Sequence, residues 1–132
     1  MEIISVLGEE KKILSTLDEW YQNQQIMAEA PYLELRTAVS EACLNAIEHG
    51  NLANPSLPVE VEVNWSPQAV VVVVKDCGPG FDRPKASEED RGWGLRFIQE
   101  FMDEITFYRE TVGKKRFCLE MTKRLTGGAI NA

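Results

Sequence analysis

The sequence is poor in the residue types that several functional classes require. Its 132 residues include 3 cysteines and 1 histidine, so we expect neither a disulfide framework nor a zinc site. Lys and Arg number 14 against 21 Asp and Glu, which gives a formal net charge of −7. A surface of that sign repels nucleic-acid phosphates and anionic lipids. We therefore expect no direct nucleic-acid partner and no membrane partner.

Long hydrophobic segments are also missing. The longest apolar run covers residues 69–74, which is far too short to cross a bilayer. The first residues lack the basic region and long apolar stretch of a signal peptide. Together with the few cysteines, this predicts a cytoplasmic protein. No G-x-x-x-x-G-K-[ST] motif occurs, so a Walker-type phosphate loop is excluded.

The hydrophobic pattern predicts a single α+β domain over residues 1–125, followed by a frayed tail over residues 126–132. Apolar alternation predicts strands over residues 2–7, 59–65, 69–75, 104–109 and 116–122. Helical spacing predicts helices over residues 9–25, 32–49 and 94–102, with Gly50 ending the second. Residues 76–90 are rich in glycine, proline and charge and are predicted to be a mobile loop.

This order of elements favours a two-layer α/β sandwich, in which helices cover one face of a mostly antiparallel mixed sheet. The strand over residues 69–75 contains five consecutive valines, which is typical of a central strand or one buried on both faces. All three cysteines are expected in the core, at positions Cys43, Cys77 and Cys118.

A polar stripe follows the predicted helix over residues 32–49. Glu41, Asn45 and Glu48 recur at spacings of four and three, so they share a face separate from the apolar stripe. A carboxylate one turn before a carboxamide brings oxygen-rich groups together, and Mg2+ prefers oxygen ligands, with water and phosphate completing its shell. A solvated helix face without a ligand fits the same spacing.

The segment Asp76-Cys77-Gly78-Pro79-Gly80 comes directly after the valine-rich strand. A carboxylate at a strand end accepts hydrogen bonds, for example from an exocyclic amine and from a water. The glycines allow close backbone approach and positive φ. The alternative is a turn that merely needs glycine and proline.

The segment Arg91-Gly92-Trp93-Gly94-Leu95 leads into the last predicted helix. Free N–H groups at a helix start, together with the helix dipole, form a site for an anion. Arg91 is placed to reach a phosphate there. A flexible glycine linker with a solvated arginine is the alternative.

The order and spacing of these motifs resemble the N box and the two glycine boxes of the GHKL (Bergerat-fold) ATPase superfamily. The matching residues are Glu41-x-x-x-Asn45-x-x-x-His49-Gly50-Asn51, Asp76-x-Gly78-x-Gly80 and Gly92-x-Gly94. Residues 39–51, 101–104 and 121–125 are similar to anti-sigma factor serine/threonine kinases of the RsbW/SpoIIAB type. The resemblance extends over nearly the whole chain, to Leu125.

The resemblance implies a role for each motif residue. Glu41 matches the general base that takes a proton from an attacking serine hydroxyl or water, and Asn45 matches the Mg2+ ligand that bridges to the phosphates. Asp76 matches the residue that hydrogen-bonds the adenine amino group. The other candidates for nucleotide binding are His49, Gly78, Gly80, Arg91, Gly92, Trp93, Gly94 and Leu95. The position of His49 by itself favours a helix-terminal role over a catalytic one.

The resemblance also implies a function and partners. It implies an ATP- and Mg2+-dependent protein-serine kinase, acting as an anti-sigma factor or partner-switching regulator. Its substrate would be a STAS-domain antagonist, a sigma factor is a possible second partner, and a homodimer is expected. Two alternatives stay open: a non-catalytic ATP-binding module that sequesters a partner, and a stand-alone histidine-kinase-like ATPase domain.

Overall fold

A five-stranded antiparallel sheet forms one layer of the molecule, and helices form the other. The computed structural model describes residues 1–78, 92–111, 113 and 115–125. The strands are β1 (Glu2–Ile4), β2 (Pro58–Trp65), β3 (Ala69–Asp76), β4 (Glu104–Glu110) and β5 (Arg116–Arg124). Their order in the sheet is β1-β2-β3-β5-β4, and each neighbouring pair is antiparallel. The predicted α+β sandwich is therefore confirmed.

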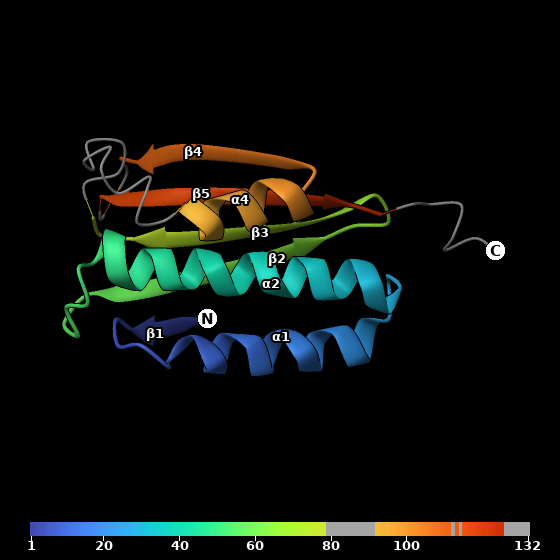
Figure 1. The fold of residues 1–132 in the computed structure, drawn as a ribbon, viewed down its shortest axis with the longest axis horizontal. Coiled ribbons are helices and arrows are strands. Elements are labelled where there is room, and N and C mark those ends of the chain that lie inside the picture. Colours follow the sequence, from blue (N-terminus) through green and yellow to red (C-terminus); the bar gives the residue numbers. More distant parts are fainter. Residues whose placement is uncertain (79–91, 112, 114, 126–132) are drawn as a thin grey trace.

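The helices all lie on one face of this sheet (Figure 1). They are α1 (Glu10–Gln24), α2 (Glu29–Asn45), the π-helical turn η1 (Ala46–Gly50) and α4 (Gly92–Phe101). Helix α2 lies between α1 and α4 and runs along the middle of the sheet (Figure 1). No helix in the described part of the chain is long and apolar enough to cross a membrane.

The core lies between α2 and the central strands. The predicted apolar stripe of α2 is buried, with exposed fractions of 0% at Leu35 and Val39 and 2% at Ala42. Opposite it, Val70, Val72 and Val74 of β3 alternate toward the helices and are also buried. Because β3 pairs with β2 on one side and β5 on the other, its valine run occupies the sheet centre as predicted.

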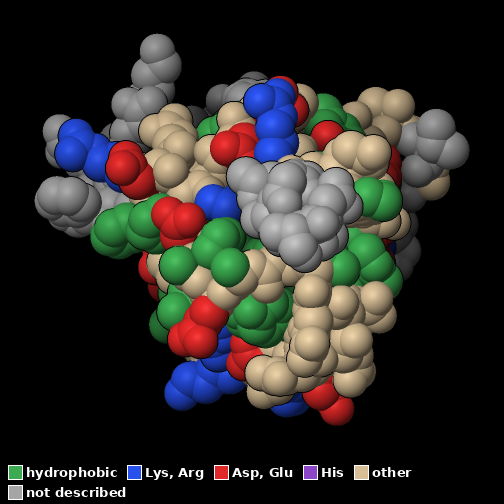
Figure 2. Space-filling view, turned by 90° about the vertical axis from the view of Figure 1, so that its right-hand side faces the viewer, with side chains coloured by type: hydrophobic (Ala, Val, Ile, Leu, Met, Phe, Trp, Pro, Cys, Tyr) green, Lys and Arg blue, Asp and Glu red, His purple; other side chains and the backbone are tan. Residues whose placement is uncertain are grey.

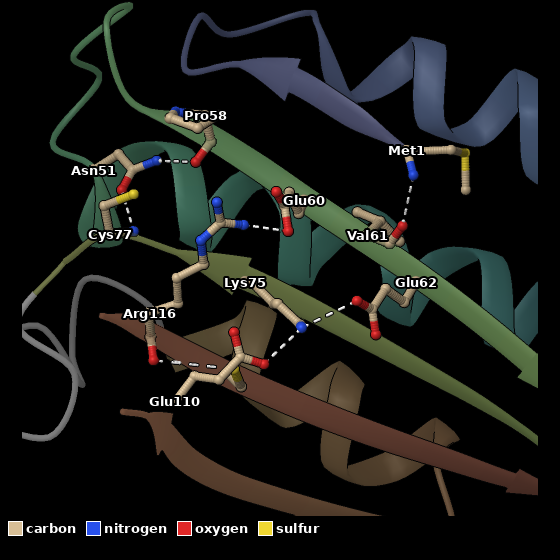
Figure 3. A network of polar contacts seen from close by, with 11 residues as sticks. Met1, Asn51, Pro58, Glu60, Val61, Glu62, Lys75, Cys77, Glu110 and Arg116 are labelled. Atoms are coloured by element: carbon tan, nitrogen blue, oxygen red, sulfur yellow. Dashed lines mark hydrogen bonds and ion pairs between the residues drawn. The ribbon is translucent and has the colours of Figure 1, made fainter. Parts of the chain in front are cut away.

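The face of the sheet that carries no helix is held by ion pairs. Lys75 lies between two acidic side chains, with its Nζ 3.0 Å from Glu62 of β2 and 2.7 Å from Glu110. Arg116 forms an ion pair with Glu60 on the same face (Figure 3). Lys75 and Arg116 are each 8% exposed. Burying a charged group to this degree costs free energy unless the charge is paired, and both cations are paired with carboxylates.

The structure changes three local expectations. The second helix starts at Glu29, and it continues past Asn45 as a π-helical turn rather than ending as a regular helix at Gly50. The residues with left-handed backbone after this turn are Leu52 and Ala53, at φ 51° and 54°, and Gly50 is not among the positive-φ residues. Cys43 and Cys118 are buried in the core as predicted. Cys77 is only half-buried, because it follows the last residue of β3.

One cavity lies at the Ala69 end of β3, where Ala69 pairs with Arg124, and not at the Asp76 end. It has a volume of about 570 Å³ and is lined by Ile26, Met27, Pro31 and Lys123, among other residues. Figure 2 shows the molecule from the end that carries the α1–α2 connection, where hydrophobic, acidic and basic side chains are intermixed. None of the predicted catalytic or nucleotide-binding residues that the structure describes lines this cavity, although Asp103 and Lys123 belong to the segments 101–104 and 121–125 that carry part of the resemblance.

We predict that Leu35→Ala lowers the free energy of unfolding by about 2–5 kcal/mol, because it removes a fully buried side chain from the α2–sheet interface. The matched control is Leu33→Ala on the same helix, where the side chain is 49% exposed and the loss should stay within about 0.5 kcal/mol. Urea unfolding measures both values. Equal losses in the two variants would contradict the assigned face of α2.

Candidate functional site

Three of the residues selected from the sequence line one small cavity at the Asp76 end of the sheet. They are Asn45 at the end of α2, Asp76 at the end of β3 and Leu95 in α4. The rest of the wall is mainly apolar and comes from Ala42, Ala46, Val74, Phe107, Phe117 and Leu119. The sheet centre, the end of α2 and the start of α4 therefore converge on this cavity.

The carboxylate of Asp76 is held in place by the backbone around it. The residue is 3% exposed, and its Oδ1 accepts a hydrogen bond of 2.8 Å from the N–H of Gly78. A Cβ on Gly50 would lie 2.4 Å from Cγ and Oδ2 of this carboxylate, which is too close for any real side chain. Gly50, the last residue of η1, therefore also allows the close approach to Asp76.

Gly78 has a similar reason to lack a side chain. A Cβ there would lie 2.1 Å from the carbonyl oxygen of Gly50. The sequence predicted that the glycines here allow close backbone approach and positive φ. Gly78 is not among the positive-φ residues, so the structure shows only the close approach. The end of η1 and the segment after β3 are thus packed backbone against backbone.

Asn51 is the site residue that sequence reasoning missed. It is 2% exposed, its Oδ1 accepts a 2.7 Å hydrogen bond from the N–H of Cys77, and its Nδ2 donates to Ser5 Oγ and to the Pro58 carbonyl, each at 2.9 Å (Figure 3). Asn51 does belong to the N-box run, and it directly follows the predicted helix. Membership in this run is the one indication in the sequence that Asn51 belongs to the site, but an asparagine in an exposed turn would look the same.

Glu41 lies one helical turn before Asn45, as the spacing predicts, but it does not line the cavity. It is half-buried. Burial raises the pKa of its carboxyl group, and the charge of Glu48 raises that pKa further. A carboxyl group with a raised pKa is a stronger base once it is ionised, which suits proton abstraction.

The remaining predicted residues fall into three groups. Gly92, Trp93 and Gly94 form the first turn of α4, which starts two residues earlier than predicted. His49 is half-buried in η1 and does not line the cavity, and it does have an interaction partner. Gly80 and Arg91, and most of the predicted loop over residues 76–90, lie outside the described residues.

These features define a histidine kinase-like ATPase domain, and the chain belongs to that family. The family described as "Histidine kinase-like ATPase domain" matches residues 7–123. The match includes the N box on α2 and η1 as well as both glycine boxes. The superfamily expected from the sequence motifs is thereby confirmed.

Several proteins similar in sequence to this chain are named anti-sigma F factors. An "Anti-sigma F factor" of Anoxybacillus flavithermus is 31% identical over 103 residues, which are 70% of this chain and 69% of the relative. One from Bacillus cytotoxicus is 31% identical over 105 residues, with the same two coverages. One from Clostridium perfringens strain SM101 is 31% identical over 87 residues, only 62% of its length. The predicted resemblance to anti-sigma factor kinases of the RsbW/SpoIIAB type is therefore confirmed as a sequence similarity.

The chemistry of the cavity fits ATP. A buried carboxylate beside stacked Phe107 and Phe117 rings, whose centroids are 5.8 Å apart, suits a flat purine that carries an amino group. The cavity itself has a volume of about 20 Å³, room for about one water molecule. A purine therefore needs the cavity walls to move apart.

The described residues contain no group of three or more His, Cys, Asp or Glu side chains that could hold a metal. Of the described residues that line the cavity, Asn45 and Asp76 carry side-chain oxygens, and the family resemblance assigns Mg2+ to Asn45. A single protein oxygen is compatible with a metal whose other ligands are water and phosphate oxygens.

We predict that Glu48→Gln lowers the pKa of Glu41 toward its ordinary value. The shift should be partial, because burial is the larger cause and remains in the variant. An NMR titration of the Glu41 carboxyl carbon measures this pKa. The control is Glu29→Gln in the first turn of the same helix, which should leave the pKa unchanged. An unchanged pKa in Glu48→Gln would exclude Glu48 as a cause.

Proposed function

We propose that this protein is an ATP- and Mg2+-dependent protein-serine kinase, built as a single domain over residues 1–125 and acting as an anti-sigma factor or partner-switching regulator. The observation that carries the proposal is the convergence of Asn45 and buried Asp76 on one cavity, with Glu41 one turn away on α2. The family match and the anti-sigma F factor relatives support it.

Each residue of the site has a defined task in this reaction. The Asp76 carboxylate would accept a hydrogen bond from the adenine amino group, and the Asn45 amide oxygen would hold Mg2+, which would supply positive charge for the phosphates. Bound MgATP supplies the γ-phosphoryl group and neutralises charge during its transfer. Glu41 accepts the proton of the attacking serine hydroxyl as the new phosphorus–oxygen bond forms and the bond to the leaving ADP breaks. The raised pKa of Glu41 matches this task.

The partners in this proposal follow from the relatives. The similar proteins are named anti-sigma F factors, so we propose a sigma factor as one partner. The resemblance of the sequence motifs to kinases of the RsbW/SpoIIAB type leads us to propose a STAS-domain antagonist as the phosphorylated substrate. We also propose that the protein acts as a homodimer in the cytoplasm. Light scattering over a range of concentrations tests the dimer, and a constant monomer mass would contradict it.

Asp76→Asn and Asn45→Ala should each lower ATP affinity at least about tenfold, or about 1.4 kcal/mol, because each removes a direct contact to the nucleotide or its metal. Calorimetric titration with MgATP measures this. Asp103→Asn and Asn64→Ala make the same chemical changes away from the cavity and should leave the affinity unchanged. Unchanged affinity in both site variants would refute the assignment.

Glu41→Gln should abolish phosphate transfer while ATP binding is retained, because the carboxamide keeps the shape of the side chain but accepts no proton. The measurement is transfer of labelled γ-phosphate to candidate STAS proteins, with Glu29→Gln as the active control. Absence of transfer by the wild type to every candidate would favour the sequestration module. An acid-labile phosphohistidine product would instead indicate a histidine-kinase-like domain.

A further inference from the structure

We infer that Gly50 and Asn51 are positioning residues that set the place of the Asp76 carboxylate and, through it, the preference for adenine. This inference rests on the proposed function, because it takes Asp76 as the residue that recognises the adenine amino group. Neither Gly50 nor Asn51 lines the cavity, so both act through Asp76.

The two residues hold the segment after β3 from both sides. Asn51 fixes the backbone beyond Asp76, because its Oδ1 accepts the N–H of Cys77 at 2.7 Å. Gly50 leaves the space that the Asp76 carboxylate occupies, because a Cβ at Gly50 would lie 2.4 Å from Cγ and Oδ2 and would force the carboxylate to shift. The N–H of Gly78 then sets the carboxylate's orientation through its 2.8 Å bond to Oδ1.

The amide of Asn51 is itself immobilised on its other side. Its Nδ2 donates to Ser5 Oγ and to the Pro58 carbonyl, and Ser5 Oγ donates in turn to the Leu57 carbonyl at 2.6 Å. The side chain is 2% exposed, so water does not compete for these bonds. The acceptor oxygen is therefore presented to Cys77 in one orientation, and Figure 3 shows the amide between Pro58 and Cys77.

This arrangement separates two roles of one side chain. The donor side of Asn51 ties the residue after η1 to Ser5, which follows β1, and to Pro58 at the start of β2, which is a structural role. The acceptor side ties η1 to the residue next to Asp76, which bears on base recognition. A positional error at Asp76 weakens the hydrogen bond to the adenine amino group, and leaves contacts to the rest of the purine and to the phosphates in place.

The test compares the affinities for MgATP and for the triphosphate of purine riboside, which lacks the amino group, by calorimetry. The wild type should prefer ATP about tenfold or more, and Asp76→Asn should remove the preference. Asn51→Ala and Gly50→Ala should reduce the preference to below about threefold, with the loss confined to ATP. Gly50→Ala decides the question by itself if Asn51→Ala does not fold.

Two matched variants separate positioning from stability. Asn51→Asp keeps an acceptor for Cys77 and removes the donor side, and Ser5→Ala removes a partner of the donor side only. Both should lower the melting temperature and keep the preference for ATP. A preference that falls in step with melting temperature across all the variants would overturn the inference and leave a structural role.

The remaining outcomes distinguish this inference from the proposed function. A preference lost in Asp76→Asn but kept in both Asn51→Ala and Gly50→Ala overturns the inference alone. A wild type without any preference, unchanged by Asp76→Asn, overturns the adenine site and the inference with it.

Discussion

The contact between the end of η1 and the end of β3 is the constraint on which the site depends. Gly50 and Gly78 meet backbone to backbone, and the Asn51 amide joins Cys77 to β1 and β2. Leaving one buried polar group without a partner costs about 1–3 kcal/mol, so a side chain with several buried partners strongly favours this arrangement.

The charged side chains at the ends of β3 and β5 are divided between the two faces of the sheet. Lys75 and Asp76 are neighbours in β3, and Arg116 and Phe117 are neighbours in β5, so the members of each pair point to opposite faces. The two cations are paired with carboxylates on the face without helices, while Asp76 faces the cavity. Glu41, one turn before the cavity residue Asn45, lies close enough to Glu48 for the charge of Glu48 to raise its pKa, so the described residues on this part of the helix are acidic. A bound triphosphate therefore benefits from a metal ion that offsets its charge.

The small cavity volume adds a conformational requirement. Its walls come from α2, η1, α4 and three strands, and in this conformation they leave no room for a purine. Leu95 belongs to α4, whose first turn contains the second glycine box. Elements that are distant in the sequence therefore limit the space at this site together, as in any close-packed interior.

Local periodicity was sufficient to predict the helices, the strands and the shared face of Glu41 and Asn45, because each depends on residues within a few positions of one another. The resemblance to a family then predicted that Asn45, Asp76 and Leu95 belong to one site, which no local pattern shows. The helical segment ends at Gly50 as predicted, but the contact of Gly50 with Asp76 was not predicted, since a glycine at a helix end gives no sign that it also makes room for a carboxylate 26 positions away. Asn51 was missed because its partners lie 46 residues before it and 26 after it. These contacts form only when the end of η1 packs on the folded sheet. Hydrogen bonds between residues so far apart in the sequence produce no periodic pattern in the chain.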